Sequence, residues 1–455
     1  MIDILLRAAS AIQQAINIVF HFLTVDYFRQ IALLSASASP TMKRIIVLGG
    51  SYAGISTAHR ILKQAAKIGP LKITLVSPNT DFYWSMASPR GVVPGQIADE
   101  KLFQPIAAGF SKYPAAQFEF TLAKAEKLDV EAKSVGISSG ETLDYDYLIV
   151  ATGSRTRAHT PFKALGSTEE TRDALHDFQS EVKEAKTIVV AGAGVTGVEA
   201  AGELAYEYGR EKKIILVGLN DPMTHSLMIR RVKCCFSMHP VNPSQIASGP
   251  TILEESPASV SNYALKALKN LKVTVKLDTK VMSSAQLPAG QKELTLSNGD
   301  TLTTDMYIPT FGLIPNSSYI PAPYLNTNGS VMVDEYLRVK GAKDVWAIGD
   351  VSDVESWQFI TCDRQSAHLA RNMISMMNNR PPLPYKVAAS RMISVFIIRD
   401  GVLTDLVAGF MGLQIGKKAA TGHFGSWRLP SFIVARARRT LFVENMGPTV
   451  DGSLF

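Results

Sequence analysis

Two stretches of the chain share one hydrophobic pattern. Each begins with a short apolar run, Ile45–Leu48 in the first and Ile188–Ala191 in the second. A short run bounded by glycine is typical of a strand that is buried on both faces of a parallel sheet. Apolar positions spaced three and four apart follow each run and indicate a helix. They are Ile55, Ala58, Ile61 and Leu62 in the first stretch and Ala200, Ala201, Leu204 and Ala205 in the second. The pattern predicts an α/β fold with two similar units.

A glycine-rich turn lies between strand and helix in both units. Its three positions are Gly49, Ser51 and Gly54 in the first unit and Gly192, Gly194 and Gly197 in the second. In a dinucleotide-binding turn the first glycine allows the bend, the second lets the backbone approach the pyrophosphate, and the third allows close helix–strand packing. The N–H groups at the start of the helix then face the phosphates. The second turn matches this pattern fully, whereas Ser51 crowds the phosphate approach in the first. We predict a dinucleotide at each turn.

The acidic residues expected near a dinucleotide-binding turn are only partly present. Glu199 follows the second turn, and we place it in the first turn of the helix. An acid there is either favoured by the helix dipole or contacts the nicotinamide or ribose, and we favour the contact. The next strands end at Ser77 and Gly218, where an acid commonly binds the ribose. The choice between NADH and NADPH therefore stays open.

A second internal similarity links the two units. Residues 138–153 align without gaps with residues 297–312, and both stretches combine a hairpin turn with a strand that ends in glycine, Gly153 or Gly312. Each stretch lies about one nucleotide-binding unit after its own glycine-rich turn. The chain therefore contains two copies of one design. Two cofactor sites on one chain imply electron transfer between the cofactors.

Four ordered motifs carry a resemblance to a known family. Residues 145–153 (YDYLIVATG) and 345–350 (VWAIGD) resemble the second and third FAD motifs of the FAD-dependent pyridine-nucleotide oxidoreductases. Residues 82–90 and 421–431 resemble the apoptosis-inducing-factor-like branch, which includes ferroptosis-suppressor-type quinone reductases and, more distantly, type II NADH dehydrogenases. The resemblance covers about residues 43–455. It implies two Rossmann-like dinucleotide-binding domains in a glutathione-reductase-like arrangement, with a small C-terminal α+β domain.

The resemblance also implies domain borders. We expect a leader over residues 1–42, an FAD-binding domain over 43–165 and 304–380, an NAD(P)H-binding domain over 166–303, and a C-terminal interface domain over 381–455. Two stretches depart from the family, and we interpret both 221–250 and 396–410 as inserted loops. Long loops without secondary structure are uncommon in compact domains, so no function is assigned to them.

The cofactors implied by the resemblance are FAD and either NADH or NADPH. The expected FAD residues are Gly49, Ser51, Gly54, Ser77, Arg90, Thr152, Gly153, Gly349 and Asp350, and the expected NAD(P)H residues are Gly192, Gly194, Gly197, Glu199 and Gly312. Asp350 would bind the ribityl and pyrophosphate region. Arg90 would lie near the flavin or its phosphates, unless it is an ordinary surface arginine. We interpret Trp84 as a core residue rather than a flavin wall. A helix over residues 365–372 should direct its positive N-terminal end at the flavin.

Composition argues against several other functions. Cys234, Cys235 and Cys362 form neither a C-x-x-C pair nor a zinc spacing, which argues against disulfide reductases of this fold and against a metal site. So few cysteines fit a reducing, intracellular setting, with the cytoplasm the first choice. Two anionic cofactors are sufficient to explain the net charge of +7. Because no dense Lys/Arg run with interleaved aromatic residues occurs, nucleic-acid binding is a rival that takes second place.

The N-terminal segment has an amphipathic helical period over residues 2–23, and its apolar part is too short to span a bilayer. Three interpretations stay open for it: a helix packed on the domain, a non-native leader before Met42, and a mitochondrial presequence.

A second amphipathic segment lies near the C-terminus. Residues 427–442 carry four arginines and no acid, and a helical wheel gathers Ile433, Val434, Ala437 and Leu441 on one side. Such a segment can lie on an anionic membrane surface. It can equally be an interface helix that covers the flavin site with its arginines in solvent, and we favour this second interpretation slightly.

The patterns and the resemblance together predict an enzyme that passes electrons from NAD(P)H through FAD to a small acceptor, for which we expect a quinone. Two rival functions remain. One is electron transfer to oxygen or to a protein partner. The other is an apoptosis-type factor that acts mainly by binding nucleic acid or protein.

Overall fold

The computed structural model describes residues 42–218, 251–254, 256–387, 393–399, 402–408, 410–425 and 427–455. Apart from Met42, the expected leader lies outside these residues, and so does the expected insertion over 221–250. Among the described residues, no helix combines the length and the apolar character needed to cross a bilayer.

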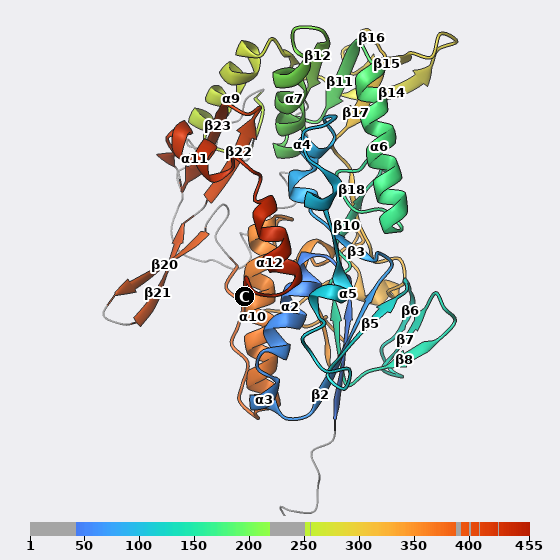
Figure 1. Cartoon of the computed structure of the whole chain (residues 1–455), viewed down its shortest axis with the longest axis vertical. Coiled ribbons are helices and arrows are strands. Elements are labelled where there is room, and N and C mark those ends of the chain that lie inside the picture. The colour runs from blue at the N-terminus through green and yellow to red at the C-terminus, as the bar shows by residue number, and fades with distance from the viewer. Residues whose placement is uncertain are drawn as a thin grey trace, which may run out of the picture.

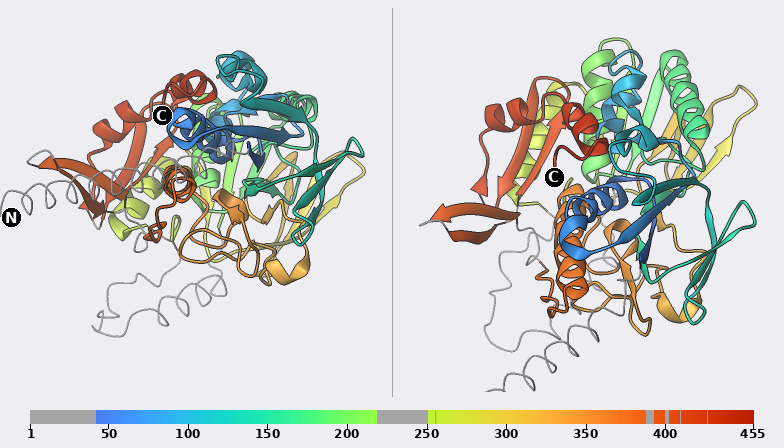
Figure 2. Two further views of the ribbon diagram at one scale, coloured as in Figure 1. Left: turned by 90° about the horizontal axis from the view of Figure 1, so that it is seen from below. Right: turned by 60° about the horizontal axis from the view of Figure 1, so that its bottom comes forward.

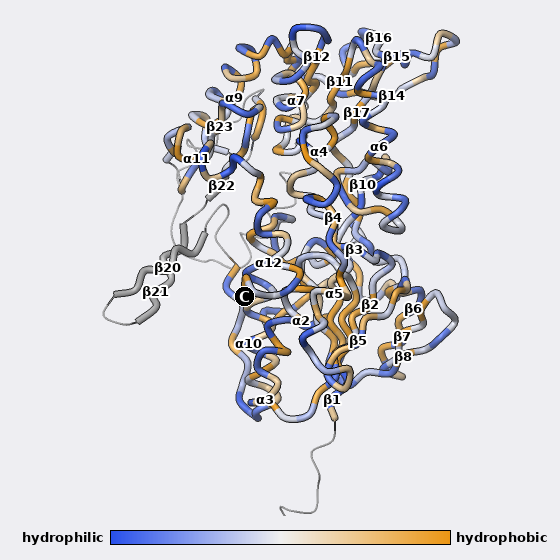
Figure 3. Tube along the Cα trace, viewed as in Figure 1, coloured by the Kyte–Doolittle hydropathy of each residue, from blue (hydrophilic) through white to orange (hydrophobic). Residues whose placement is uncertain are grey.

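A five-stranded parallel sheet forms the first nucleotide-binding unit (Figure 1). Its strands, in spatial order, are β19 (Val345–Ala347), β9 (Tyr147–Val150), β1 (Lys43–Leu48), β2 (Leu71–Ser77) and β5 (Phe118–Leu122). The run Ile45–Leu48 is buried, as expected for a central strand. Figure 3 shows apolar residues gathered along these strands.

A four-stranded parallel sheet forms the second unit with the same neighbour relations. Its order is β13 (Thr274–Lys276), β12 (Lys213–Val217), β11 (Thr187–Ala191) and β17 (Met306–Pro309). The strand before each glycine-rich turn, β1 or β11, lies between the next strand along the chain and the return strand, β9 or β17. The internal repeat predicted from residues 138–153 and 297–312 is therefore confirmed.

Each unit also contains a three-stranded antiparallel meander, and the return strand follows it directly in the chain. The first consists of β6 (Ala125–Asp129), β7 (Ser134–Ile137) and β8 (Thr142–Asp144), and the second of β14 (Val281–Gln286), β15 (Lys292–Leu296) and β16 (Thr301–Thr304). Just beyond the return strands, β10 (Ser154–Thr156) pairs antiparallel with β18 (Leu313–Pro315). The two connections between the units therefore run side by side.

Helices flank the sheets and complete the core. They are α2 (Tyr52–Leu62), α3 (Ala65–Ile68), α4 (Ser88–Gly91), α5 (Ile106–Gly109), α6 (Thr168–Glu184), α7 (Val195–Tyr208), α9 (Ala258–Asn270) and α10 (Phe359–Met377), with short strands β3 (Asp81–Tyr83) and β4 (Phe103–Pro105) pairing near α5. α10 packs along α2, and α4 packs against α7. The helix expected over 365–372 is longer and begins at Phe359.

The C-terminal part adds a small sheet and two helices. β22 (Phe410–Ile415), β23 (Ala419–Phe424) and β24 (Trp427–Arg428) form the sheet, which packs against α7, α9 and α11 (Ser431–Ala437). The loop expected over 396–410 is wrong. β20 (Ile393–Arg399) and β21 (Val402–Ala408) pair as an antiparallel hairpin that projects from the rest of the chain (Figures 1 and 2).

The last helix, α12 (Met446–Val450), returns to the first unit and lies beside α2. His59 of α2 is fully buried beneath it and stacks on Phe110 with ring centroids 3.9 Å apart. Its Nε2–H donates to the Val450 carbonyl at 2.8 Å, so Nδ1 is left to accept from the Tyr113 hydroxyl at 3.1 Å. The C-terminal residues are thus fixed to the helix that follows the first glycine-rich turn.

Burial of His59 makes stability depend on pH. Burial lowers the pKa of His59 to about 4, whereas an unfolded histidine titrates near 6.5. Between these values the unfolded chain binds a proton that the folded chain does not, so stability is lost as the pH falls from 6.5 towards 4. We expect this group to contribute a loss on the order of 2 kcal/mol. Urea unfolding at pH 7 and pH 5 should show a smaller pH dependence for His59→Phe than for the wild type. Equal pH dependence in the two proteins would contradict this account.

Candidate functional site

The first glycine-rich turn is shaped by the close approach of backbone to backbone. Gly49 has a φ of +119°, and a Cβ there would overlap the carbonyl group of Ala151. A Cβ at Gly54 would overlap the carbonyl oxygen of Gly49. α2 then begins with Ser51 as its N-cap, which makes no side-chain capping bond among the described residues, and its first turn contains no acid. The first N–H groups of α2 are therefore left to bind an anion.

Ser77, at the end of β2, lies against this turn. Its hydroxyl accepts from the backbone N–H of Asn79 at 3.1 Å, and a Cβ at Gly50 would come within 2.6 Å of it. The contact between Ser77 and the FAD ribose stays a prediction.

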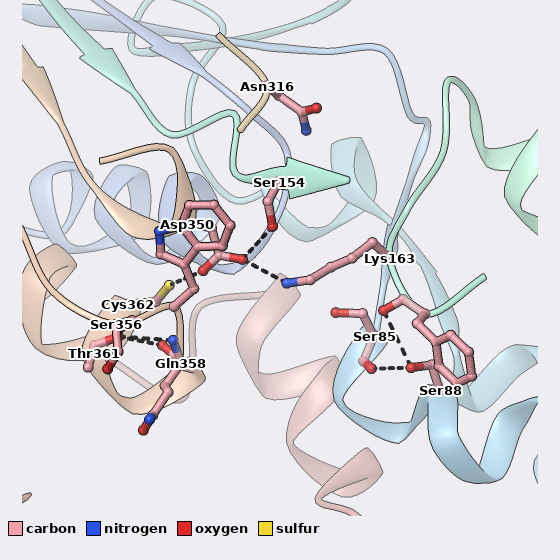
Figure 4. Close-up of polar contacts among 12 residues, drawn as sticks. Ser85, Ser88, Ser154, Lys163, Asn316, Asp350, Ser356, Gln358, Thr361 and Cys362 are labelled. Atoms are coloured by element: carbon pink, nitrogen blue, oxygen red, sulfur yellow. Dashed lines mark hydrogen bonds and ion pairs between the residues drawn. The ribbon is translucent and has the colours of Figure 1, made fainter. Parts of the chain in front are cut away.

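Asp350 is the centre of a polar cluster that the sheet brings together. It follows β19 in the short 3₁₀ turn Gly349–Val351 and is buried. Its Oδ2 accepts from the Ser154 hydroxyl at 2.8 Å and from the Lys163 ammonium at 2.7 Å. The Cys362 thiol of α10 lies 3.8 Å from Oδ1. Figure 4 shows the three side chains converging on this carboxylate.

Charge pairing decides the protonation states in this cluster. Burial alone would raise the pKa of Asp350, but Lys163 and Ser154 hold it below its ordinary value. Burial alone would lower the pKa of Lys163, but the carboxylate raises it. Burial raises the pKa of Cys362, so its sulfur stays a thiol. The cluster therefore presents a carboxylate and an ammonium group, both charged, and no reactive thiolate.

Neighbouring backbone groups extend the site. The Gly349 N–H donates to the Gln365 side chain at 2.7 Å, and the Thr152 hydroxyl donates to the Asn316 carbonyl at 2.7 Å. Gly153 has a φ of +65°, and no atom lies within 4 Å of the position that its Cβ would occupy. The side of Gly153 that a Cβ would occupy is therefore open.

Ser154 and Lys163 were not expected at the site, whereas Gln365 was expected near the flavin only as the first residue of a helix. Lys163 lies in the connection between β10 and α6, which has no periodic pattern, so only the tertiary fold places it beside Asp350. Ser154 directly follows Gly153 of the second motif, and this neighbourhood was the available signal.

Trp84 is buried in the core, as predicted. Its ring meets Phe82 and Phe359 edge-on, with centroids 5.7 and 5.8 Å away, and its indole N–H donates to the Leu441 carbonyl at 2.9 Å.

Arg90 occupies a different setting from the one expected. The surface alternative is wrong, because Arg90 is buried. Nε and Nη2 donate to the two carboxylate oxygens of Glu203 at 3.0 and 2.8 Å, and Nη1 donates to the Arg439 carbonyl at 2.7 Å. All three guanidinium nitrogens thus bind protein groups, so the expected contact with FAD stays a prediction.

The second glycine-rich turn has the same shape as the first but is more open. Gly192 has a φ of +115°, and a Cβ at Gly197 would overlap its carbonyl oxygen. Gly194, the N-cap of α7, has open space where its Cβ would lie. Val195, the first residue of α7, is 41% exposed. Gly312, at the end of the matching return strand, has a φ of +76°.

Glu199 lies in the second turn of α7 and not in the first, because the helix begins at Val195. Its Oε1 accepts from Arg438 Nη2 at 2.8 Å and from the Gln414 N–H at 3.0 Å. Burial raises the pKa of Glu199, although Arg438 and Gln414 oppose the shift. Its contact with nicotinamide or ribose stays a prediction.

Comparison with known proteins identifies the family. Residues 43–374 match the family described as pyridine nucleotide-disulphide oxidoreductase. The chain belongs to this family. Its cofactors are FAD and NAD(P)H, and it is an FAD-dependent NAD(P)H oxidoreductase. The uncapped start of α2, the open side of Gly153 and the buried Asp350 fit FAD, and the open Gly194 turn fits the nicotinamide dinucleotide.

Several relatives resemble most of the chain. It is 49% identical over 418 residues to "Oxidoreductase ptaL" of Pestalotiopsis fici, covering 91% of this chain and 100% of the relative. It is 25% identical over 390 residues to ferroptosis suppressor protein 1 of Mus musculus, covering 84% and 95%. The sulfide:quinone oxidoreductase structure from Aquifex aeolicus superposes with a TM-score of 0.63 at 16% identity, covering 90% of this chain and 92% of that one, which shows the fold.

Substitution of Asp350 should separate FAD binding from the rest of the fold. Asp350→Asn removes the negative charge that accepts bonds from Ser154 and Lys163. A hydrogen bond to a charged group contributes about 1.5–3 kcal/mol, so FAD affinity should fall roughly tenfold or more. The flavin absorbance retained per protein after gel filtration measures this. Glu199→Gln is the matched control and should retain FAD, and equal retention in the two variants would contradict the assignment of the two sites.

Substitution of Gly194 should block the nicotinamide dinucleotide without harming the fold. The open space at Gly194 accepts a side chain, whereas Gly197→Ala would clash with the Gly192 carbonyl. Gly194→Val should therefore melt near the wild-type temperature, and Gly197→Ala should melt lower. Reduction of the bound FAD by NAD(P)H should collapse in Gly194→Val, while dithionite still reduces it. Near wild-type reduction by NADH would show that the nucleotide binds elsewhere.

Proposed function

We propose that the electron acceptor is a quinone dissolved in a membrane, which the enzyme reaches as a peripheral protein on an intracellular membrane surface. The overall reaction would be NAD(P)H + H⁺ + quinone giving NAD(P)⁺ + quinol. Bound FAD supplies the redox chemistry, because it can take a hydride from a nicotinamide and give two electrons to an acceptor. The protein's own residues bind, orient and shield the reactants.

Different described residues would bind the cofactors and limit the choice of acceptor. The two glycine-rich turns present helix N-termini to the pyrophosphates. Asp350 offers a carboxylate to hydroxyl groups, and Lys163 places a positive charge next to it. With Cys362 held as a thiol and no C-x-x-C pair in the sequence, a disulfide acceptor is disfavoured.

The observation that carries the proposal is an exposed apolar and basic surface in the C-terminal part, which we call the C-terminal face. Trp427, Phe432 and Ile433 are 81%, 75% and 48% exposed. The exposed arginines Arg428, Arg436 and Arg439 lie within the same short stretch. Large apolar side chains among basic ones can enter the boundary of an anionic membrane, where each basic residue adds about 1 kcal/mol. The similarity to ferroptosis suppressor protein 1 and the resemblance to quinone reductases support the same acceptor.

The structure corrects part of the apolar side that the helical wheel predicted. α11 ends at Ala437, so Leu441 does not belong to the helix. Val434 and Leu441 are buried, whereas Ile433 of the same predicted side is exposed, together with Phe432 and the preceding strand residue Trp427. The short helix therefore packs on the small sheet and leaves Phe432 and Ile433 in solvent, and both interpretations of this segment stay predictions.

The C-terminal face should be needed for a membrane-dissolved acceptor and not for a soluble one. A triple variant, Trp427→Ser, Phe432→Ser and Ile433→Ser, should bind anionic liposomes at least roughly tenfold more weakly, because about 1.5–3 kcal/mol is lost per buried side chain. It should turn over a long-chain quinone in those liposomes slowly, yet reduce a short-chain quinone in buffer at the wild-type rate. Cosedimentation and steady-state assays with NADH and NADPH measure both effects.

A matched control carries serine at Met282 and Leu383, two exposed apolar residues outside the C-terminal face. It should behave like the wild type in both assays. Failure of the wild-type protein to bind anionic liposomes at low salt would overturn the membrane proposal. Failure to reduce any quinone would overturn the acceptor and favour oxygen or a protein partner.

A further inference from the structure

Two buried ion pairs lie one helical turn apart on α7. Glu199 pairs with Arg438 at 2.8 Å, and Glu203 pairs with Arg90 through both carboxylate oxygens. The two arginines come from different parts of the chain: Arg90 from α4 of the first unit, and Arg438 from the turn after α11. One face of the helix that follows the second glycine-rich turn is thus held by charges from both neighbouring parts.

Residues 438–442, which we call the α11 turn, connect these partners to one another. Arg90 also donates to the Arg439 carbonyl at 2.7 Å, and Trp84 donates to the Leu441 carbonyl at 2.9 Å. The α11 turn therefore receives two hydrogen bonds from the first unit and gives one ion pair to α7. Each bond fixes a different residue of the turn.

The backbone of the α11 turn is strained. Leu441 and Phe442 have φ values of +52° and +58°, a left-handed conformation that costs about 1–2 kcal/mol per residue for a side chain larger than glycine. Such strain persists only where the surroundings determine the conformation, and it concentrates at functional sites. Trp84 and Arg90 supply that restraint here.

Polar atoms in the same place are left unsatisfied. Among the described residues, Arg438 Nε and both side-chain amide atoms of Gln414 are buried without a hydrogen-bond partner. The backbone N–H of Gln414 and Nη2 of Arg438 both donate to Oε1 of Glu199. Buried polar groups in proteins are nearly always hydrogen-bonded, so these atoms leave hydrogen-bonding groups without a partner directly beside the Glu199 contact.

We propose that the α11 turn positions α7 for hydride transfer, and that Arg438 is the positioning residue through which it acts on Glu199. The inference rests on the proposed use of the second turn for NAD(P)H. Because Gly194 and Glu199 lie on the same short stretch of α7, a shift of the Glu199 contact moves the nucleotide relative to the first unit. A misplacement of about 1 Å can slow a reaction roughly a hundredfold.

The decisive measurement is anaerobic single-turnover reduction of the bound FAD over a range of NAD(P)H concentrations. Arg438→Met should lower the limiting rate roughly tenfold to a hundredfold, with a change of less than about threefold in the Kd of the nucleotide. The primary deuterium isotope effect on that rate should also change. Arg438→Lys should restore part of the rate, because it keeps the charge but loses the fork geometry. Arg210→Met, at an exposed arginine just after α7, is the control and should reduce like the wild type.

A double-mutant cycle tests the route through Glu199. Glu199→Gln with Arg438→Met should reduce no more slowly than Arg438→Met alone if the two residues act as a pair. A limiting rate for Arg438→Met within twofold of the wild type, at full FAD content, would overturn the proposal. If Arg438→Met loses FAD or folds poorly, a wild-type rate and isotope effect in Arg438→Lys would overturn it instead. If neither NADH nor NADPH reduces the flavin of the wild-type protein, the proposed function is refuted, and not this inference alone.

Discussion

In both nucleotide-binding units the helix packs so closely against the end of the preceding strand that even a Cβ atom would not fit between them, and this contact determines the rest of each unit. At Gly54 and again at Gly197 the helix backbone touches the carbonyl oxygen of the turn's first glycine. That contact fixes the direction of α2 and α7, and therefore fixes where their free N–H groups lie. Close packing at the glycines sets the position of each predicted phosphate site, and the partial positive charge at the helix N-terminus then favours the anion. Ser51 is tolerated in the first turn because the middle position is not part of that contact.

Burial of charge completes each site differently. In the first unit the charges belong to Asp350 and Lys163, which lie at the end of β19 and beside β10 and are kept ionised by one another. In the second unit the charges belong to Glu199 and Glu203 of α7, which bind arginines from other parts of the chain. The first pair joins the end of β19 to the connection after β10, and the other two pairs join α7 to segments from other parts of the chain. Breaking a buried pair leaves an uncompensated charge and costs about 3–5 kcal/mol, so the pairs of Glu199 and Glu203 are sensitive to substitution.

The sequence predicted those features that depend on residues close together in the chain. The turns at Gly49 and Gly192, the return strands and the repeat all have local patterns, and the topology confirms them. Arg90 and Glu199 show what local patterns cannot give. Their partners, Glu203 and Arg438, are respectively 113 and 239 residues away in sequence. The hairpin of β20 and β21 was missed because a departure from the family pattern does not tell whether the additional residues pair with each other. Lys163 was missed because no period marks a connecting loop.

The pairing of β10 with β18 makes the second unit a closed excursion from the first. The Arg157 N–H donates to the Gly312 carbonyl at 3.0 Å, so the chain leaves and re-enters the first unit at one point. Because the two ends of the second unit lie close together, its insertion adds little loop-closure entropy to the folding of the first unit. In evolution, the second unit can therefore be inserted, lost or replaced as a whole without a change in the strand order of the first unit's sheet.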